Sequence, residues 1–287
     1  MPFSRRTFGK LAVAAVPVSS AFAAAQPINS TFHGVRLGIG SYSFRGLTLT
    51  DIVSQMAAIP MGELELESWF VEPAAVNREA LRQWRLTVPL DELRAIRKQF
   101  EDAGIHIYAY NIPVDESFTT EELDRVFQMA RALGVDILNV VSMLPAAPQL
   151  IAPSAQYKMR VGFHTAGAAQ NPNSMGSGDS YRQVIALAPN FGINPDLGQC
   201  ARWGPDPLAF LREMHLRVTT LHTHDRGPTA YTAFGQGQMP IREILQLIKA
   251  EKYSFIPMIE RIQRPVGSDS VTELRRSVDY CKSVLAP

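Results

Sequence analysis

The chain is short of cysteine, of net charge and of long apolar runs, and each shortage excludes a class of protein. Its two cysteines, Cys200 and Cys281, are too few for a disulfide scaffold, and their placement in a strand-end loop and in the last helix predicts free thiols. The 28 Lys and Arg residues nearly balance the 27 Asp and Glu residues, which leaves no basic face for nucleic acid. Only the N-terminal segment carries a long uncharged apolar run. This composition favours a small neutral molecule as the partner.

Residues 1–25 have the zones of an export signal. Basic residues open the segment, and the uncharged apolar run LAVAAVPVSSAFAAA follows them. The run is too short to be a membrane anchor, and we expect no stable anchor once the signal has been cleaved. The pair Arg5 and Arg6 favours a twin-arginine signal, although an ordinary secretory signal with two arginines stays open. We expect cleavage after Ala23 or Ala25 and a periplasmic location for the mature chain.

Strand-like and helix-like segments alternate along residues 26–287, without a linker or a low-complexity tract between them. The apolar runs that read as buried strands are 35–44, 62–68, 105–112, 135–142, 159–164, 191–197, 217–222 and 255–260. The helical patterns that follow them are 49–59, 89–104, 119–134, 147–158, 179–190, 206–215, 240–252 and 270–286. This order predicts one α/β domain, a (β/α)8 TIM barrel.

Two connections are longer than a barrel normally needs. Residues 71–88 separate the second strand from its helix, and residues 225–239 follow the seventh strand. Both come after the carboxyl end of a strand, the end at which barrels carry their sites. We expect the first to fold over the mouth as a lid or a short helix, and the second to lie at the same mouth.

Several of the predicted strands end on a group that can bind a metal. Asp196, His222 and Glu260 stand at the ends of the last three strands, and His164 ends the fifth. In a closed parallel barrel these ends converge on one mouth. Two carboxylates and an imidazole suit Mn²⁺, Mg²⁺, Co²⁺ or Zn²⁺. Each residue alone could instead be structural, His222 as a hydrogen-bonded barrel histidine and Glu260 as the partner of an arginine.

With these motifs the chain resembles the sugar phosphate isomerase/epimerase family of xylose isomerase-like TIM barrels, in particular its exported members. The likeness covers essentially the whole mature chain and rests on LGIGSYSFRG, VGFHTAG, PDLGQCARWGPDP, TLHTHDRGP and AFGQGQMPIREILQLIKAEKYSFIPMIE. The resemblance implies a divalent metal, Mn²⁺ first, held by Asp196, His222 and Glu260. It also implies a carbohydrate substrate and an isomerase or epimerase activity.

The chain departs from the family pattern beside these ligands. One histidine, His164, remains of the usual His-Asn-His, and Gln199 and His224 stand where the family has histidine and lysine. Gln236 replaces the glutamate of a Gly-Glu-Gly loop, and the fourth strand ends without a carboxylate. We expect His164, Glu65 or water to complete the metal site.

Proton transfer beside a metal-polarised carbonyl needs an acid and a base within reach. Glu260 is the first candidate, and His164 or Glu65 is the second. Glu65 also alternates with Leu64 and Leu66 as one face of a strand does, so a purely structural role stays open for it.

Sugar recognition needs an aromatic surface and polar groups around it. We take Trp69, which precedes the 71–88 segment, as the aromatic surface, and Gln199, His224 and Arg226 as the polar contacts. An aromatic residue is more often packing, and a surface salt bridge is as reasonable for Arg226. A free sugar is favoured over a phosphorylated one because no glycine-rich loop precedes a helix to bind phosphate.

The sequence therefore predicts a metal-dependent sugar isomerase or epimerase that acts on a keto-sugar or a sugar derivative. Two alternatives stay open: a catalytically reduced barrel that binds a sugar or a partner, and a metal-dependent lyase or dehydratase that acts on a keto-glycoside. A nuclease on the same barrel would need further histidines and a basic surface. The sequence leaves a homo-oligomer open.

We predict that the chain recovered from the periplasm of an expressing cell begins near Gln26. The double variant Arg5→Lys with Arg6→Lys should stay uncut in the cytoplasm, because the twin-arginine route reads the arginine pair. Intact-mass spectrometry of the two cell fractions measures both outcomes, with Lys10→Arg as the control that keeps the pair. Export of the double variant at the normal level would favour an ordinary secretory signal.

Overall fold

The structure is a computed structural model of the chain, and it describes residues 25–74, 76–261 and 268–287. The expected signal therefore lies outside the described residues, apart from residue 25. No helix in the described ranges is long and apolar enough to cross a bilayer. Cys200 and Cys281 are both buried free thiols, as expected.

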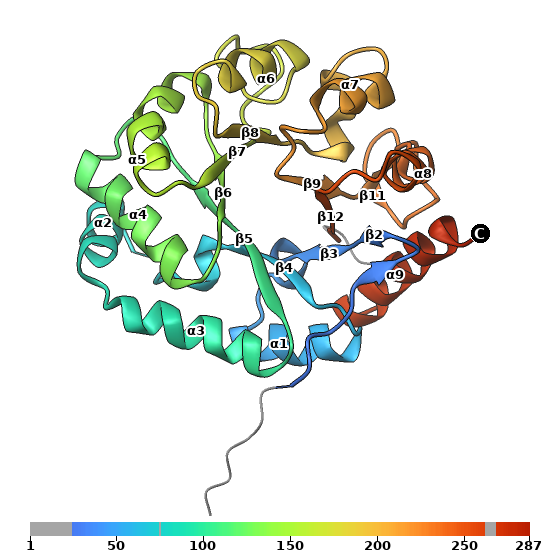
Figure 1. Cartoon of the computed structure of the whole chain (residues 1–287), viewed down its shortest axis with the longest axis horizontal. Coiled ribbons are helices and arrows are strands. Elements are labelled where there is room, and N and C mark those ends of the chain that lie inside the picture. Colours follow the sequence, from blue (N-terminus) through green and yellow to red (C-terminus); the bar gives the residue numbers. More distant parts are fainter. Residues whose placement is uncertain (1–24, 75, 262–267) are drawn as a thin grey trace, which may run out of the picture.

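Eight parallel strands form the central sheet, and Figure 1 shows them as a ring surrounded by helices. In chain order they are β3 (Gly38–Gly40), β4 (Glu63–Glu67), β5 (His106–Pro113), β6 (Ile137–Val141), β7 (Arg160–His164), β8 (Phe191–Asn194), β9 (Thr220–Thr223) and β12 (Ile256–Ile259). The spatial order is β8-β7-β6-β5-β4-β3-β12-β9, and parallel bridges from Ile193 to Val218 and from Asp196 to His222 join the two ends. The predicted TIM barrel is confirmed.

Helices connect successive strands on the outside of the barrel (Figure 1). They are α1 (Leu49–Ala58), α3 (Leu90–Asp102), α4 (Thr120–Ala132), α5 (Ile151–Gln156), α6 (Gly178–Ile185), α7 (Pro207–Met214), α8 (Ile241–Glu251) and α9 (Ser270–Leu285). Side chains cap the first turns of several of these helices. The Thr48 hydroxyl accepts from Asp51 N at the start of α1, and the Thr119 hydroxyl accepts from Glu122 N at the start of α4. Pro148 and Pro153 limit the fourth helical region to a 3-10 turn, η3 (Leu144–Leu150), and the six-residue α5.

Short elements complete the molecule. A hairpin, β1 (Thr31–Phe32) and β2 (Val35–Arg36), precedes the barrel. Three further 3-10 turns follow barrel strands: η1 (Ser41–Phe44), η2 (Ser68–Phe70) and η4 (Leu197–Arg202). The 225–239 segment contains a second hairpin, β10 (Asp225–Arg226) and β11 (Tyr231–Thr232). The Asp225 carboxylate accepts hydrogen bonds from the backbone N–H groups of Gly235, Gly237 and Met239, which fixes this segment.

The middle of the barrel is polar. The Asn139 amide donates to Thr220 Oγ1 (2.7 Å) and accepts from Thr219 Oγ1 (2.8 Å), and Asn194 donates to Thr220 Oγ1 (2.6 Å). Position 162 must be glycine, since a Cβ there would lie 2.0 Å from Thr219 Oγ1. Buried polar groups of this kind are tolerated because they bond to one another.

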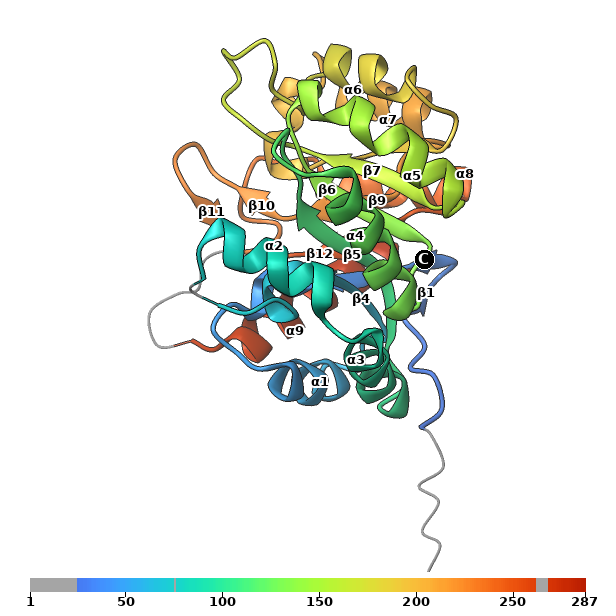
Figure 2. The same ribbon diagram turned by 90° about the vertical axis from the view of Figure 1, so that its left-hand side faces the viewer.

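The 71–88 segment forms the short helix that we expected, α2 (Arg78–Thr87). Arg85, 2 % exposed, pairs with Glu72 (Nε to Oε1, 2.6 Å) and with Glu122 on α4 (Nη1 to Oε1, 2.8 Å). Arg78 pairs with the other oxygen of Glu122 at 2.6 Å. Figure 2 shows α2 beside α4, on the side of the barrel that carries β10 and β11. These ion pairs hold α2 against the outer ring of helices.

We predict that Arg85→Ala lowers the free energy of unfolding by roughly 3 kcal/mol, because it leaves the Glu72 carboxylate without its arginine and the buried Glu122 with Arg78 alone. Arg94→Ala is the control: its pair with Asp91 is exposed, so the loss should stay within about 0.5 kcal/mol. Urea unfolding followed by circular dichroism measures both. Equal losses in the two variants would show that the buried pair does not hold α2.

Candidate active site

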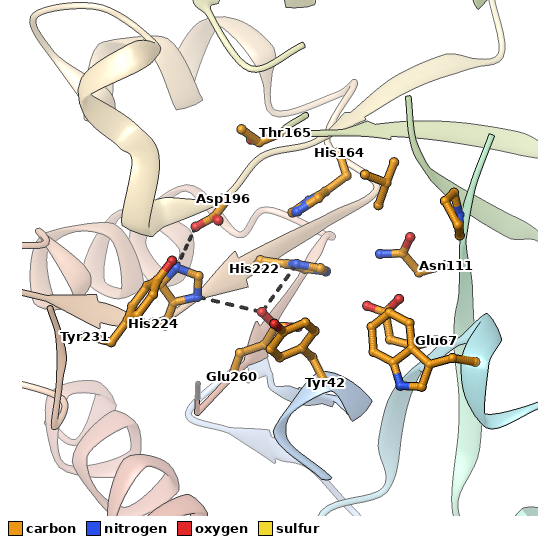
Figure 3. Close-up of a pocket in the computed structure, with 13 residues that line it drawn as sticks. Tyr42, Glu67, Asn111, His164, Thr165, Asp196, His222, His224, Tyr231 and Glu260 are labelled. Carbon is orange, nitrogen blue, oxygen red and sulfur yellow. Dashed lines mark ion pairs between the residues drawn. The ribbon is translucent and has the colours of Figure 1, made fainter. Parts of the chain in front are cut away.

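A cavity of about 380 Å³ opens at the carboxyl ends of the barrel strands (Figure 3). Every barrel strand, or the turn directly after it, supplies part of its wall. The lining residues are Tyr42, Glu67, Trp69, Asn111, Pro113, Val141, His164, Thr165, Asp196, His222, His224, Tyr231 and Glu260. The strand ends that drew attention in the sequence thus meet at one cavity.

Asp196, His222 and Glu260 are placed by the backbone of three neighbouring strands. Asp196 follows β8 and lies opposite His222 of β9 in the bridge that closes the barrel. Its Oδ1 accepts from Gly198 N at 2.7 Å, which caps η4. Glu260 follows β12, and its N–H donates to Thr223 O at 2.9 Å. His222 Nδ1 faces Glu260 Oε2 at 3.5 Å (Figure 3).

Glu65 of β4 lies behind His222 and does not line the cavity. It is fully buried, and it accepts from His222 Nε2 (2.8 Å), Asn111 Nδ2 (3.1 Å) and Thr220 Oγ1 (2.7 Å). Burial alone would raise the pKa of Glu65, but the His222 charge and these hydrogen bonds lower it to about 2. Glu65 is therefore a carboxylate in the folded protein, and it fixes the orientation of the His222 ring.

The pKa of His222 is raised well above its ordinary value. Burial acts in the opposite direction, but the carboxylates of Glu260 and Glu65 on either side of the ring outweigh it. His164 differs: its ring lies 4.6 Å from that of His222, and burial, together with the His222 charge, lowers its pKa. The Nδ1 of His164 is 3.1 Å from Asn194 O and donates to it, so Nε2 remains as the acceptor of the neutral ring.

The His224 ring lies between two carboxylates. Its Nε2 is 2.8 Å from Asp196 Oδ1, and its Nδ1 is 3.7 Å from Glu260 Oε2 (Figure 3). Burial would lower the pKa of His224, but Asp196 and then Glu260 raise it to about 9. The pKa of Asp196 falls in turn, because His224 outweighs the effect of burial. The Tyr231 ring packs edge-on against His224 at 4.7 Å.

Glu67 is a cavity residue that the sequence reasoning missed. It is 4 % exposed, and burial, followed by the charges of Glu260 and Glu65, raises its pKa well above the ordinary value. These effects favour the protonated form of Glu67, which can donate a hydrogen bond. The sequence contained a pattern that could have identified Glu67, since it follows Glu65 by two residues and so continues the same strand face toward the mouth.

The other predicted contacts separate into two groups. Trp69 and His224 line the cavity, whereas Gln199 and Arg226 do not. Gln199 donates to Asp196 Oδ2 at 3.3 Å and accepts from Arg202 at 2.9 Å. The Arg226 guanidinium lies 5.8 Å from the centre of the Tyr231 ring. Asn111, Thr165 and Tyr231 are further lining residues that the sequence did not single out.

Asp196, His222 and Glu260 offer donor types that fit a divalent cation. Glu260 Oε1 is buried and has no hydrogen-bond partner among the described residues, and Glu65 holds the Nε2 of His222 so that Nδ1 faces Glu260. Among the described residues, however, no three His, Cys, Asp or Glu side chains are grouped as closely as a formed metal centre requires. The His224 ring lies between the two carboxylates instead.

Comparison with known proteins identifies the architecture. No family model and no curated protein matches the sequence. Among solved structures, an L-ribulose 3-epimerase is similar over 88 % of this chain and 94 % of its own, with a TM-score of 0.67 and 14 % identity. A sugar phosphate isomerase/epimerase from Parabacteroides distasonis covers 94 % of this chain and 99 % of its own, with a TM-score of 0.62 and 17 % identity.

A probable 3-DHS dehydratase from Bacillus anthracis is also similar, over 85 % of this chain and 97 % of its own, with a TM-score of 0.65 and 14 % identity. At these identities the likeness establishes the fold. The structural neighbours are sugar phosphate isomerase/epimerase and xylose isomerase-like TIM barrel proteins, in keeping with the resemblance drawn from the sequence.

We predict that the free energy of unfolding of Glu67→Gln increases relative to that of the wild-type protein as the pH rises above 4.5. The unfolded chain ionises Glu67 near its ordinary pKa of 4.5, whereas burial and the neighbouring carboxylates raise the pKa of Glu67 in the folded form. Folded wild-type protein thus holds more protons than the unfolded chain, and its stability falls with pH by up to about 1.4 kcal/mol per unit. A glutamine side chain does not titrate, so the variant avoids this loss.

Urea unfolding of both proteins from pH 4.5 to 7, in a buffer with EDTA, measures the difference. The exposed Glu92→Gln variant is the control and should run parallel to the wild type. A Glu67→Gln difference that stays constant with pH would show that Glu67 is ionised in the folded protein.

Proposed function

We propose that this chain is a sugar isomerase or epimerase that moves a proton at the carbon next to the carbonyl of a keto-sugar. The observation that carries the proposal is the convergence of buried carboxylates and imidazoles from neighbouring strands at one cavity. The structural neighbours with sugar epimerase and isomerase names support this reaction class at the level of fold.

Asp196, His222 and Glu260 would hold a divalent cation, with Mn²⁺ preferred for two carboxylates and one imidazole. Such a cation, when bound, polarises the sugar carbonyl and makes the neighbouring C–H more acidic. Glu65 is a positioning residue in this scheme, because it bonds to the His222 Nε2 and does not reach the cavity. Water or His164 would complete the set of ligands.

The groups that we propose for proton transfer reach the cavity and differ in their protonation. Glu260 is the proposed base, since its Oε1 is buried and no residue in the described part of the chain bonds to it. His164, neutral and with Nε2 as the acceptor, is the proposed second base. Glu67, held protonated, would donate its proton to a sugar oxygen as negative charge develops there.

The substrate is proposed to be a small-molecule carbohydrate. Trp69 and Tyr42 offer aromatic faces at the cavity mouth for the apolar side of a sugar ring. His224 would contact sugar hydroxyls from the cavity wall, whereas Gln199 and Arg226 would act through Asp196 and Tyr231, which they contact. The export signal proposed from the sequence would place the activity in the periplasm.

A second candidate is a barrel that binds a sugar without turning it over. The placement of His224 favours it, because this ring already forms an ion pair with Asp196 and lies close to Glu260. A lyase or dehydratase acting on a keto-glycoside is the third candidate, and the similarity to a probable dehydratase keeps it in view. A chemical test separates these candidates.

We predict that the mature chain contains about one divalent cation and incorporates solvent deuterium beside the carbonyl of its ketose substrate. Elemental analysis measures the cation, and mass spectrometry of a ketose panel incubated in D₂O with Mn²⁺ measures the exchange. Asp196→Ala should lose most of the bound metal and slow the exchange at least roughly 100-fold, as loss of a metal-site interaction does.

The exposed Asp91→Ala variant is the control and should retain both metal and exchange. Sugar binding without deuterium incorporation would favour the binding barrel. Incorporation accompanied by loss of water from the sugar would favour the lyase. An exchange rate that Asp196→Ala leaves unchanged would contradict the proposed site.

A further inference from the structure

The cavity continues into a smaller depression on the rim of the barrel. This depression, of about 180 Å³, is lined by Tyr42, Arg45 and Trp69. Tyr42 and Trp69 also line the main cavity. A molecule seated in the cavity would therefore reach the depression by passing the same two rings, and we call the three residues the rim subsite.

The two rings are held in place by the ends of adjacent strands. Tyr42 lies in η1 after β3, and Trp69 lies in η2 after β4. Ser41 Oγ accepts from Glu67 N at 2.8 Å, which ties the two turns together. The rings pack edge-on, with centroids 5.6 Å apart and an interplanar angle of 79°. The aromatic surface at the rim is thus formed before any ligand arrives.

Trp69 exposes a large apolar surface although its ring packs against Tyr42. It is 43 % exposed, and it is the one aromatic residue among the exposed large hydrophobics of the described ranges. Exposed aromatic faces beside a polar cavity are typical of ligand sites, since a sugar ring covers them with its C–H face.

Arg45 supplies hydrogen-bond donors at the outer edge of the rim subsite. Its Nη1 donates to the Tyr42 hydroxyl at 2.9 Å, and its guanidinium lies 5.0 Å from the centre of the Tyr42 ring. Within the described chain it forms no ion pair with a carboxylate. A guanidinium has five N–H donors, so others remain for the hydroxyl groups of a ligand.

We propose that the rim subsite binds a second sugar ring, so that the substrate is a glycosylated keto-sugar rather than a free monosaccharide. The keto-sugar unit occupies the main cavity, and the ring attached to it stacks on Trp69 with its hydroxyls toward Arg45. This inference rests on the proposed function, because it assigns the inner unit to the proposed catalytic cavity.

A second depression adjoins the cavity at Pro113 and Val141, and its volume is about 280 Å³. Its wall carries Asp115 and Glu116 but no aromatic ring. A carbohydrate ring gains most from an aromatic face combined with donors at its edge. The second sugar is therefore assigned to the rim subsite.

Isothermal titration calorimetry on the mature chain tests this assignment. The probes are D-fructose and three glycosyl-fructoses: lactulose, maltulose and isomaltulose. We expect at least one of the three to bind about tenfold more tightly than fructose, the gain that stacking and one charged hydrogen bond supply. Arg45→Met, which keeps the alkyl stem, should remove most of this gain and change fructose binding less than about twofold.

The exposed Arg94→Met variant on α3 is the matched control and should bind every probe as the wild type does. Trp69→Ala should weaken fructose and glycosyl-fructose alike, because its ring lines both spaces. Trp69→Phe should restore part of the affinity for both.

The outcomes separate this inference from the proposed function. Fructose binding without any gain from the second ring overturns the rim subsite alone, as does an Arg45→Met variant that weakens all probes equally. A gain that depends on Arg45, in a protein that incorporates no deuterium, supports the subsite and contradicts the isomerase. Absence of binding for all four probes overturns both.

Discussion

The contact between Glu65 and His222 is the interaction on which the rest of the site depends. Glu65 lies fully buried in the barrel, and its carboxylate would be too costly to bury without the imidazole and the two further donors that it accepts from. The same contacts continue through Thr220 to the amides of Asn139 and Asn194, so side chains from five strands share one network. The orientation of His222 at the mouth follows from this network, since the ring nitrogen bonded to Glu65 leaves the other nitrogen toward Glu260.

The charges of neighbouring side chains then determine which carboxyl and imidazole groups at the strand ends carry a proton. Four carboxyl groups, those of Glu65, Glu67, Asp196 and Glu260, share the strand ends with the imidazoles of His222 and His224. Two imidazolium rings stabilise the carboxylates beside them, whereas Glu67 forms no ion pair among the described residues, and burial with the charges of Glu260 and Glu65 favours its protonated form. A cavity lined by a carboxyl group that favours its protonated form, a carboxylate oxygen without a hydrogen-bond partner among the described residues and a neutral imidazole contains groups able to donate and to accept a proton.

Hydrophobic patterning was sufficient to predict the strands, their helices and the convergence of His164, Asp196, His222 and Glu260, because a parallel barrel places every carboxyl end on the same face. It was insufficient for Glu67, whose role depends on the charges of residues from other strands. Gln199 and Arg226 show the opposite failure: both follow site residues in the sequence, yet neither lines the cavity, and they contact its lining residues Asp196 and Tyr231 instead. Arg85 is similar, since its charge pattern suits a surface helix, and only the docking of α2 on α4 buries it.

The sequence by itself determined the architecture of this protein and the identity of its strand-end groups, because the alternation of apolar strands and capped helices is a local property, and one closed barrel satisfies it over this length. The tertiary structure decided which of those groups face the cavity, which one stands behind as a support and which carboxyl group stays protonated. It also placed Tyr42, Trp69 and Arg45 together on the rim, from two turns that follow different strands. These properties arise from distances and burial between residues far apart in the chain, and such distances exist only once the barrel has closed.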